Sequence, residues 1–265
     1  MKKIAFLMVM CLVSLIALTS ATYAKFSEQY NPEIGGLQFG VATQEYLMIS
    51  KTGEVGTFKD ILDFSEFIDN PVTLNPLEGK VDTTNLSINL YDGQFVANEN
   101  DNYIKFTLYF TGSSHMKVSL KGSTTGKVVD IVGGSNINSN EQIENVIKSL
   151  RIGFIGYNTR EVPTGTGGVE YEYDPIRVNV YSVHEKQDFI DYQGIMPYQT
   201  FSNISHEGLD KNVTLVETSA NEISKMDIYI WLESEDKSCY AQQISDATLQ
   251  INLRFLAEIV EVSDA

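Results

Sequence analysis

Two histidine–glutamate pairs are the residues of this chain whose types and spacing come nearest to catalytic chemistry. The segment His184–Asp188 begins like the H-E-x-x-H helix of zinc proteases but has aspartate where the second histidine is needed. The segment His206–Asp210 departs from the motif in the same way. Zinc is held there by two imidazoles one helical turn apart, so neither segment makes the site. We therefore expect both histidines, and His115, at the surface or in turns.

The sequence shows no other catalytic pattern. It contains no G-x-S-x-G motif, and no set of serine, histidine and aspartate stands out by its spacing. The glycine-rich stretches Gly133–Ser135 and Gly165–Gly168 lack the spacing and the lysine of a phosphate-binding loop, so we interpret them as turns. We predict that the protein is not an enzyme and has no catalytic, cofactor-binding or metal-binding residues. A hydrolase with an unrecognised site is an alternative.

Calcium is the one cofactor that the acidic composition suggests. A hard cation takes about six to eight oxygen ligands, which acidic loops of exported β-proteins can supply. Two acidic clusters are candidates, namely Glu233, Glu235 and Asp236 after Trp231, and Asp60, Asp63 and Glu66 in a long loop. Neither cluster has the D-x-D-x-D-G spacing of a calcium loop, and acidic loops are more often solvated. We therefore predict no cofactor and keep calcium as the alternative.

The N-terminus has the three parts of a secretory signal peptide. A positive start, Met1–Lys3, precedes the uncharged apolar run Ile4–Leu18, and small residues follow up to Ala24. The apolar run is short for a membrane span of about 20 residues. We predict that signal peptidase removes residues 1–24 and that residues 25–265 are secreted or held at the cell surface. A retained membrane anchor is the alternative.

The composition is that of a folded, acidic protein. Of 265 residues, 43% are hydrophobic, and 35 acidic residues against 19 basic ones give a net charge of −16. We predict no nucleic-acid partner, because the phosphates of nucleic acid require clustered Lys and Arg that this chain lacks. The same charge opposes adsorption to anionic lipid, so we expect membrane contact only through the uncleaved leader. Cys239 is the only cysteine outside the leader and is expected to be a buried apolar residue.

Most of the chain after the leader has the two-residue periodicity of β-strands. Apolar and polar residues alternate in Tyr103–Phe110 and in the first part of Thr248–Val260, as far as Phe255, which predicts strands with one buried face. Met226–Leu232 is apolar on both faces, so we expect a central strand with Trp231 buried. About ten strands with few helices indicate a mostly β protein, a β-sandwich or jelly roll. The other predicted strands are Leu37–Ser50 (as one or two), Asn85–Tyr91, Met116–Lys121, Val128–Val132, Arg151–Tyr157, Val169–Tyr173, Arg177–His184 and Val213–Glu217.

One segment has helical periodicity instead. Residues 139–150 combine a capping box with apolar residues on one helical face, which predicts a short helix. A second short helix is predicted over Cys239–Ser245. Turn-forming residues predict three loops, over Phe58–Glu78, Glu161–Gly168 and Asp188–Asp210. No repeat or charge block divides residues 25–265, which we therefore expect to form a single domain.

Several short segments resemble a known class of exported protein. Thr22–Ser27 resembles the leader boundary of Gram-positive proteins processed by the SipW-type alternate signal peptidase, the class of camelysin and TasA. Gly36–Ala42, Leu47–Ser50, Leu150–Phe154 and Trp231–Cys239 are similar to later pieces of such proteins. The resemblance implies an extracellular β-sandwich or jelly roll of a cell surface or biofilm matrix. It also implies fibre assembly in some relatives, by an N-terminal strand lent to a neighbour.

We predict a secreted or cell-surface structural protein, with a biofilm-matrix or fibre-forming subunit as the more specific form. After cleavage, residues 25–34 are expected to add to the sheet edge of a neighbouring subunit. The alternative is a carbohydrate- or ligand-binding surface β-sandwich, an adhesin. Exposed aromatics such as Tyr171, Tyr173 and Tyr198 would serve that function, although cross-strand packing is the interpretation we favour for them.

Overall fold

The computed structural model describes ten stretches of the chain. They are residues 33–41, 47–63, 72–99, 102–121, 128–133, 140–163, 169–183, 198–202, 213–239 and 248–260. By its contacts the chain divides into Met1–Tyr30 and Asn31–Ala265, and all of the described residues belong to the second unit. The predicted leader and its cleavage point therefore lie outside them. Within the described stretches, no helix has the length and apolar character needed to cross a membrane.

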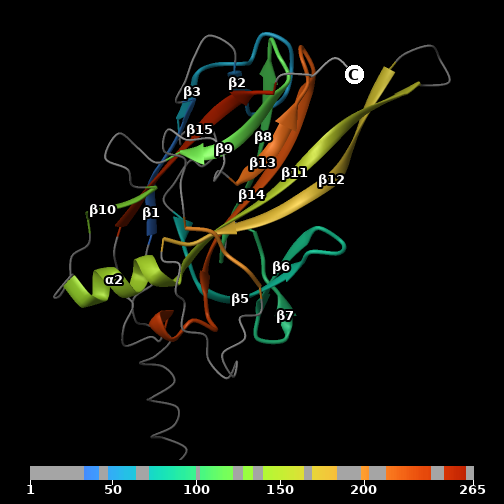
Figure 1. Cartoon of the computed structure of the whole chain (residues 1–265). Helices are drawn as coiled ribbons and strands as arrows, with labels where there is room; N and C mark the ends of the chain where they lie inside the picture. The colour runs from blue at the N-terminus through green and yellow to red at the C-terminus, as the bar shows by residue number, and fades with distance from the viewer. Residues whose placement is uncertain are drawn as a thin grey trace, which may run out of the picture. The chain divides into compact units, whose positions relative to one another are not determined.

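The described residues form two β-sheets, which confirms the predicted mostly β, sandwich-like fold (Figure 1). The first sheet has the order β13 (Thr214–Thr218), β9 (Met116–Lys121), β15 (Thr248–Ile259), β1 (Glu33–Val41) and β3 (Ile61–Asp63), with β10 (Val129–Gly133) beside β15 and β4 (Val72–Thr73) beside β1. The second has the order β12 (Val169–Tyr181), β11 (Leu150–Pro163), β14 (Ile223–Glu233), β5 (Pro76–Asp82), β6 (Ser87–Asp92) and β7 (Phe95–Val96). In the same sheet, β8 (Ile104–Gly112) pairs with β14, and β2 (Leu47–Ser50) pairs with β8.

The main hydrophobic core lies between the inner faces of the two sheets. In β8, buried and half-buried residues alternate without a break, as the sequence pattern predicts. The rings of Phe110 on β8 and Phe255 on β15 meet edge to face, with their centroids 5.1 Å apart. Contacts of this kind join the sheets into one packed unit.

A second, smaller core covers part of the outer face of the second sheet. It contains Trp231 and Tyr229 from β14 together with Leu77, Ile88 and Leu90 from the β5–β6 hairpin. This hairpin comes so close that a Cβ atom on Gly153 of β11 would lie 2.4 Å from Cδ1 of Ile88. Strand β14 lies between β11 and β8, and Trp231 is fully buried, so the predictions for this strand are confirmed.

The predicted helix is present, whereas one predicted loop is wrong. Helix α2 (Asn140–Ser149) lies within the predicted range 139–150, and β11 follows it directly, while residue 139 of the predicted capping box lies outside the described residues. The 3₁₀ turn η3 (Lys237–Cys239) ends where the second predicted helix was to begin, and the rest of that helix lies outside the described residues. The predicted loop Phe58–Glu78 contains β3, β4 and the start of β5.

The structure also corrects the limits of the N-terminal arm. Strand β1 begins at Glu33 and pairs in parallel with β15 of its own chain, so residues 33 and 34 are not available to a neighbour. The ladder has an irregularity at Gly35 and Gly36, where the register shifts between Ile34 and Gly36. A free arm is thereby limited to residues 25–32, which lie outside the described part of the chain.

Candidate functional site

Where β11 leaves α2, a charged cluster is buried. The guanidinium of Arg151 is fully shielded from solvent, and its Nη2 donates to Oδ2 of Asp236 at 2.6 Å. Its Nη1 donates to the carbonyl oxygens of Lys148 at 2.5 Å and Leu150 at 3.1 Å. Arg151 therefore ties the end of the helix and the start of β11 to the turn that follows β14. A planar guanidinium with several fixed donors suits this role.

Glu233, the last residue of β14, is the second buried carboxylate of this cluster. Its Oε2 accepts hydrogen bonds from the Tyr198 hydroxyl at 2.5 Å and from Nε1 of Trp231 at 3.2 Å. Its Oε1 accepts from the backbone N–H groups of Gly79 at 3.4 Å and Glu235 at 3.2 Å. Burial raises the pKa of Glu233 above its ordinary value, while the hydrogen bond from Tyr198 and the charge of Arg151 act in the opposite direction.

The cluster joins two of the segments on which the family resemblance rests. Leu150–Phe154 contributes Arg151, and Trp231–Cys239 contributes Glu233, Asp236 and Cys239. Burial raises the pKa of the Cys239 thiol to about 12. The charged side chains bond to one another and to the backbone, away from solvent, so the arrangement holds strand ends and a turn in place.

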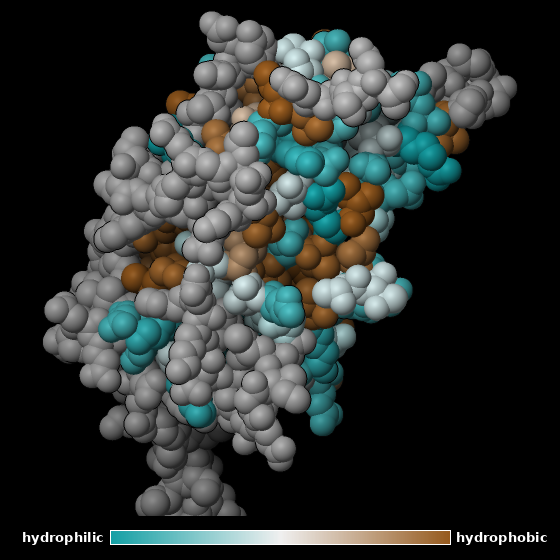
Figure 2. Space-filling model, viewed as in Figure 1, coloured by the Kyte–Doolittle hydropathy of each residue, from teal (hydrophilic) through white to brown (hydrophobic). Residues whose placement is uncertain are grey.

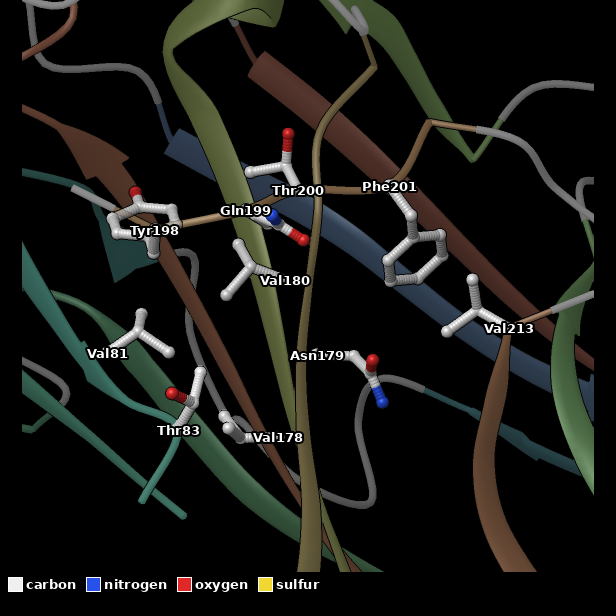
Figure 3. A pocket seen from close by; sticks show the side chains of 10 residues that line it. All are labelled: Val81, Thr83, Val178, Asn179, Val180, Tyr198, Gln199, Thr200, Phe201 and Val213. Atoms are coloured by element: carbon white, nitrogen blue, oxygen red, sulfur yellow. The ribbon is translucent and has the colours of Figure 1, made fainter. Parts of the chain in front are cut away.

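A pocket of about 650 Å³ adjoins this cluster at the edge strand β12 (Figure 3). Figure 3 places Val178 and Val180 on one side of the β12 ribbon and Asn179 on the other. The pocket thus has walls on both faces of the strand. Figure 2 shows hydrophobic residues gathered over β12 and its neighbours in this view. The residues that line it are Val81, Thr83, Val178, Asn179, Val180, Tyr198, Gln199, Thr200, Phe201 and Val213.

Tyr198 connects the pocket to the buried cluster. Its ring forms part of the pocket wall, and its hydroxyl donates to Glu233. Three residues further on, the Phe201 N–H donates to the Val180 carbonyl at 2.9 Å, and the Ser182 N–H donates to the Phe201 carbonyl at 3.0 Å. Residues 198–201 therefore cross the edge of β12, and Phe201 pairs with the backbone of that edge at Val180 and Ser182.

The outer face of the second sheet carries a row of tyrosines and lysines. Asp227 accepts hydrogen bonds from the hydroxyls of Thr107 at 2.6 Å and Tyr157 at 2.8 Å. Nζ of Lys225 lies 4.4 Å from the ring centroid of Tyr157 and 5.8 Å from that of Tyr173. These contacts are cross-strand packing of the kind that stabilises a sheet.

The three tyrosines that were considered as a sugar platform do not all lie on one accessible surface. Tyr198 is buried, and the Tyr173 ring packs edge to face on Tyr109 with centroids 6.0 Å apart. Tyr171, which is 51% exposed, keeps an accessible ring. Packing is thus the observed role of two of the three, as we favoured. The pocket and the buried cluster were not predicted, although Arg151 within an apolar strand was a signal for the cluster.

The structure describes some of the other residues that were considered for catalysis or metal binding. His115 lies at the surface, with Nε2 3.8 Å from Oε2 of Glu217, whereas His184 and His206 lie outside the described residues. In the first calcium cluster, Glu233 and Asp236 face protein donors. No group of three or more His, Cys, Asp and Glu side chains in the described stretches is placed to hold a metal ion. Calcium stays the untested alternative to the predicted absence of a cofactor, since Glu66 of the second cluster lies outside the described stretches.

Comparison with family models, with curated proteins and with solved structures found no match for this chain. The resemblance to SipW-type exported proteins therefore stays a prediction.

Proposed function

We propose that this chain is a structural protein of a cell surface or extracellular matrix, exported by its leader and assembled through extended segments. The observation that carries the proposal is the β11–β12 hairpin, which projects as a two-stranded ribbon (Figure 1). The pairing of β11 with β14 ends at Tyr157, but Asn158–Pro163 continues to pair with Val169–Asp174. A ribbon that extends beyond the pairing of its sheet offers contact surface to a neighbour.

The outer edge of β12 supports the same proposal. Within the described residues, its pairing on the side away from β11 is a single bridge between Tyr181 and Phe201. An edge strand of this length presents unpaired N–H and C=O groups that can pair with another extended chain. Assembly by strand addition needs such an edge.

The neighbouring edge of the first sheet is closed by side chains instead. The Thr214 carbonyl on β13 accepts hydrogen bonds from Arg177 at 3.3 Å and Asn179 at 3.4 Å. The Glu217 carbonyl accepts one from the Ser224 hydroxyl at 2.7 Å. These donors occupy acceptors that a further strand would use. On this side of the sandwich, strand addition is therefore expected at β12.

The N-terminal arm provides the test of assembly. If residues 25–32 add to a neighbouring subunit, a chain beginning at Lys25 should assemble and one beginning at Glu33, where β1 starts, should not. Light scattering at high salt compares the two, because both chains lack Lys2 and Lys3 and are therefore more acidic than the full sequence with its net charge of −16, and this charge opposes association until it is screened. Equal scattering from both chains would contradict a role for the arm. N-terminal sequencing of exported protein should begin at Lys25, and a sequence beginning at Met1 would contradict leader cleavage.

A ligand-binding surface protein is the second candidate, and the pocket at β12 favours it. A volume of about 650 Å³ lies within the range of roughly 300–1,000 Å³ that is common for ligand pockets. Carbohydrate binding by exposed aromatics has less support, because Tyr171 is exposed but Tyr173 and Tyr198 are used in packing. A glycan array tests that form: binding abolished by Tyr171→Ala would support it, and no binding would exclude it.

A further inference from the structure

Within the pocket, one part of the outer edge of β12 is hydrogen-bonded to Phe201, and the next part has no backbone partner among the described residues. The Val180 carbonyl and the Ser182 N–H bond to Phe201, so these groups point away from β11. In an antiparallel pair, alternate residues direct their backbone groups to the same side. The N–H and C=O of Val178 therefore also point away from β11. In the part of the chain that the structure describes, no backbone group pairs with them.

The side chains around this open edge line both faces of the strand. Val81 and Tyr198 lie on the side to which Val178 points, and Phe201 and Val213 lie on the side of Asn179 (Figure 3). An extended polypeptide places successive side chains on opposite faces and its backbone groups between them. In this pocket, the side chains of such a polypeptide would contact the apolar walls on the two faces of β12. Its backbone groups would pair with the unpaired edge between those walls.

Charge selects among the polypeptides that could enter. The described lining carries no ionised side chain, but the ribbon that continues β12 beyond the pocket is acidic. It holds four carboxylates, of Glu161, Glu170, Glu172 and Asp174, against the single guanidinium of Arg160. A second copy of this chain is acidic as well, so at low salt it would be repelled, and its assembly through the arm requires the repulsion to be screened by salt. A segment with basic residues beside the ribbon would be attracted and steered to the edge.

We infer that the pocket at Val178 is a docking slot for an extended segment of another protein, apolar at its centre and basic at its ends, which adds a strand to β12. This inference rests on the ligand-binding candidate and names its partner. It does not depend on the N-terminal arm. Its failure would therefore leave assembly, which light scattering tests, and sugar binding, which a glycan array tests, undecided.

A pair of synthetic peptides tests the slot on the full chain. One peptide alternates valine and threonine between two lysines at each end, and its twin carries glutamates in place of the lysines. Fluorescence anisotropy at low salt should give the lysine peptide at least tenfold tighter binding, with the difference shrinking as salt is added. Hydrogen exchange should show slower exchange of β12 amides around Val178 in the complex. Equal binding of the twins, or no binding, would overturn the inference.

Variants at the edge of β12 distinguish strand addition at Val178 from nonspecific binding of the peptide. Val178→Pro removes an outward N–H but no hydrogen bond to β11, so the sheet is expected to keep its ladder and the peptide to lose at least tenfold in affinity. Val178→Ala is the matched control, because it keeps the N–H, and a smaller loss is expected. The exposed ribbon change Glu170→Gln/Glu172→Gln should weaken only the lysine peptide, and circular dichroism confirms folding.

Two further results would overturn the inference. Unchanged affinity in folded Val178→Pro would show that the peptide does not pair with this edge. Tighter binding of a peptide copied from residues 25–32 than of the lysine peptide would assign the slot to a second copy of this chain. If Val178→Pro does not fold, the test rests on Glu170→Gln/Glu172→Gln. Both of these side chains are exposed, so this variant is expected to fold.

Discussion

Nη2 of Arg151 lies 2.6 Å from Oδ2 of Asp236, 85 residues further along the chain, and neither side chain is more than 2% exposed. The pair joins the start of β11 to the turn after β14. Two charges taken out of water cost free energy that their attraction offsets only in good geometry. Removing one partner leaves the other buried and uncompensated. This relationship makes the cluster the most sensitive polar part of the described fold.

The first prediction concerns this pair. Asp236→Ala should lower the free energy of unfolding by about 3–5 kcal/mol, because Arg151 then stays charged in a buried position. Urea unfolding followed by Trp231 fluorescence measures the change. The matched control is Glu172→Ala, which removes a partner of the exposed Arg160 and should cost less than about 1 kcal/mol. The double change Arg151→Met/Asp236→Leu should cost less than Asp236→Ala alone. A single-variant loss similar to that of the control would contradict a structural role for the pair.

Alternation along the sequence was sufficient to predict β8 and β15, whereas β11 was predicted only as far as Tyr157 and β12 as two separate strands, and the short strands depend on tertiary contacts. Strands β8 and β15 have one apolar face over many residues, so their period is unmistakable. Strands β3 and β4 have three and two residues, too few for a period, and exist because they pair with β1. Asn75 and Pro76 indicate a turn by residue type, yet Pro76 begins β5, where it pairs with the end of β14.

The candidate site could be predicted only in part for a similar reason. Trp231 and Cys239 were expected to be buried, since both are apolar and one lies in a strand without a polar face. The partners of Arg151 come from a distant turn, which no local pattern indicates. The pocket is formed by β5, β12, residues 198–201 and Val213, and their meeting depends on the path of the chain across the edge of β12.

The second prediction concerns the Cys239 thiol. Burial raises its pKa to about 12, so at pH 8 the thiol is both neutral and inaccessible. In a Cys11→Ser chain, a thiol reagent should label Cys239 at least a hundredfold more slowly in the native protein than in urea. A matched control chain carries Cys11→Ser, Cys239→Ser and Val55→Cys, because Val55 is 95% exposed and a thiol there should react at once. Rapid native labelling of Cys239 would show that the cluster opens readily.

The third prediction concerns the closest approach of β11 to β13. A Cβ atom on Gly156 would lie 2.1 Å from the backbone oxygen of Leu215, which cannot move without shifting β13. Gly156→Ala should therefore destabilise the protein by about 1–3 kcal/mol, as other overpacked sites do. Gly153→Ala is the control. Its nearest neighbour is Cδ1 of Ile88, the flexible end of a side chain, so a smaller loss in urea unfolding is expected. The reverse order would contradict this account of the two glycines.

The last prediction concerns stability at alkaline pH. Burial is the largest cause of a raised pKa at seven tyrosines, and it raises the pKa of Tyr181 to about 12. The seven are Tyr103, Tyr109, Tyr157, Tyr173, Tyr181, Tyr198 and Tyr229.

Each of these phenols is neutral while it holds its proton, and the unfolded chain releases that proton near the ordinary pKa of about 10. The folded chain holds the proton to higher pH, so its stabilising contribution is complete below pH 10 and is lost as the pH rises toward the folded value. The urea midpoint should therefore be steady up to about pH 9 and fall steeply between about pH 10 and 12. Tyr181→Phe removes one of these titrations and should make the fall shallower. A midpoint that stays constant across this range, or a Tyr181→Phe chain with an unchanged slope, would show that the buried tyrosines do not control alkaline unfolding.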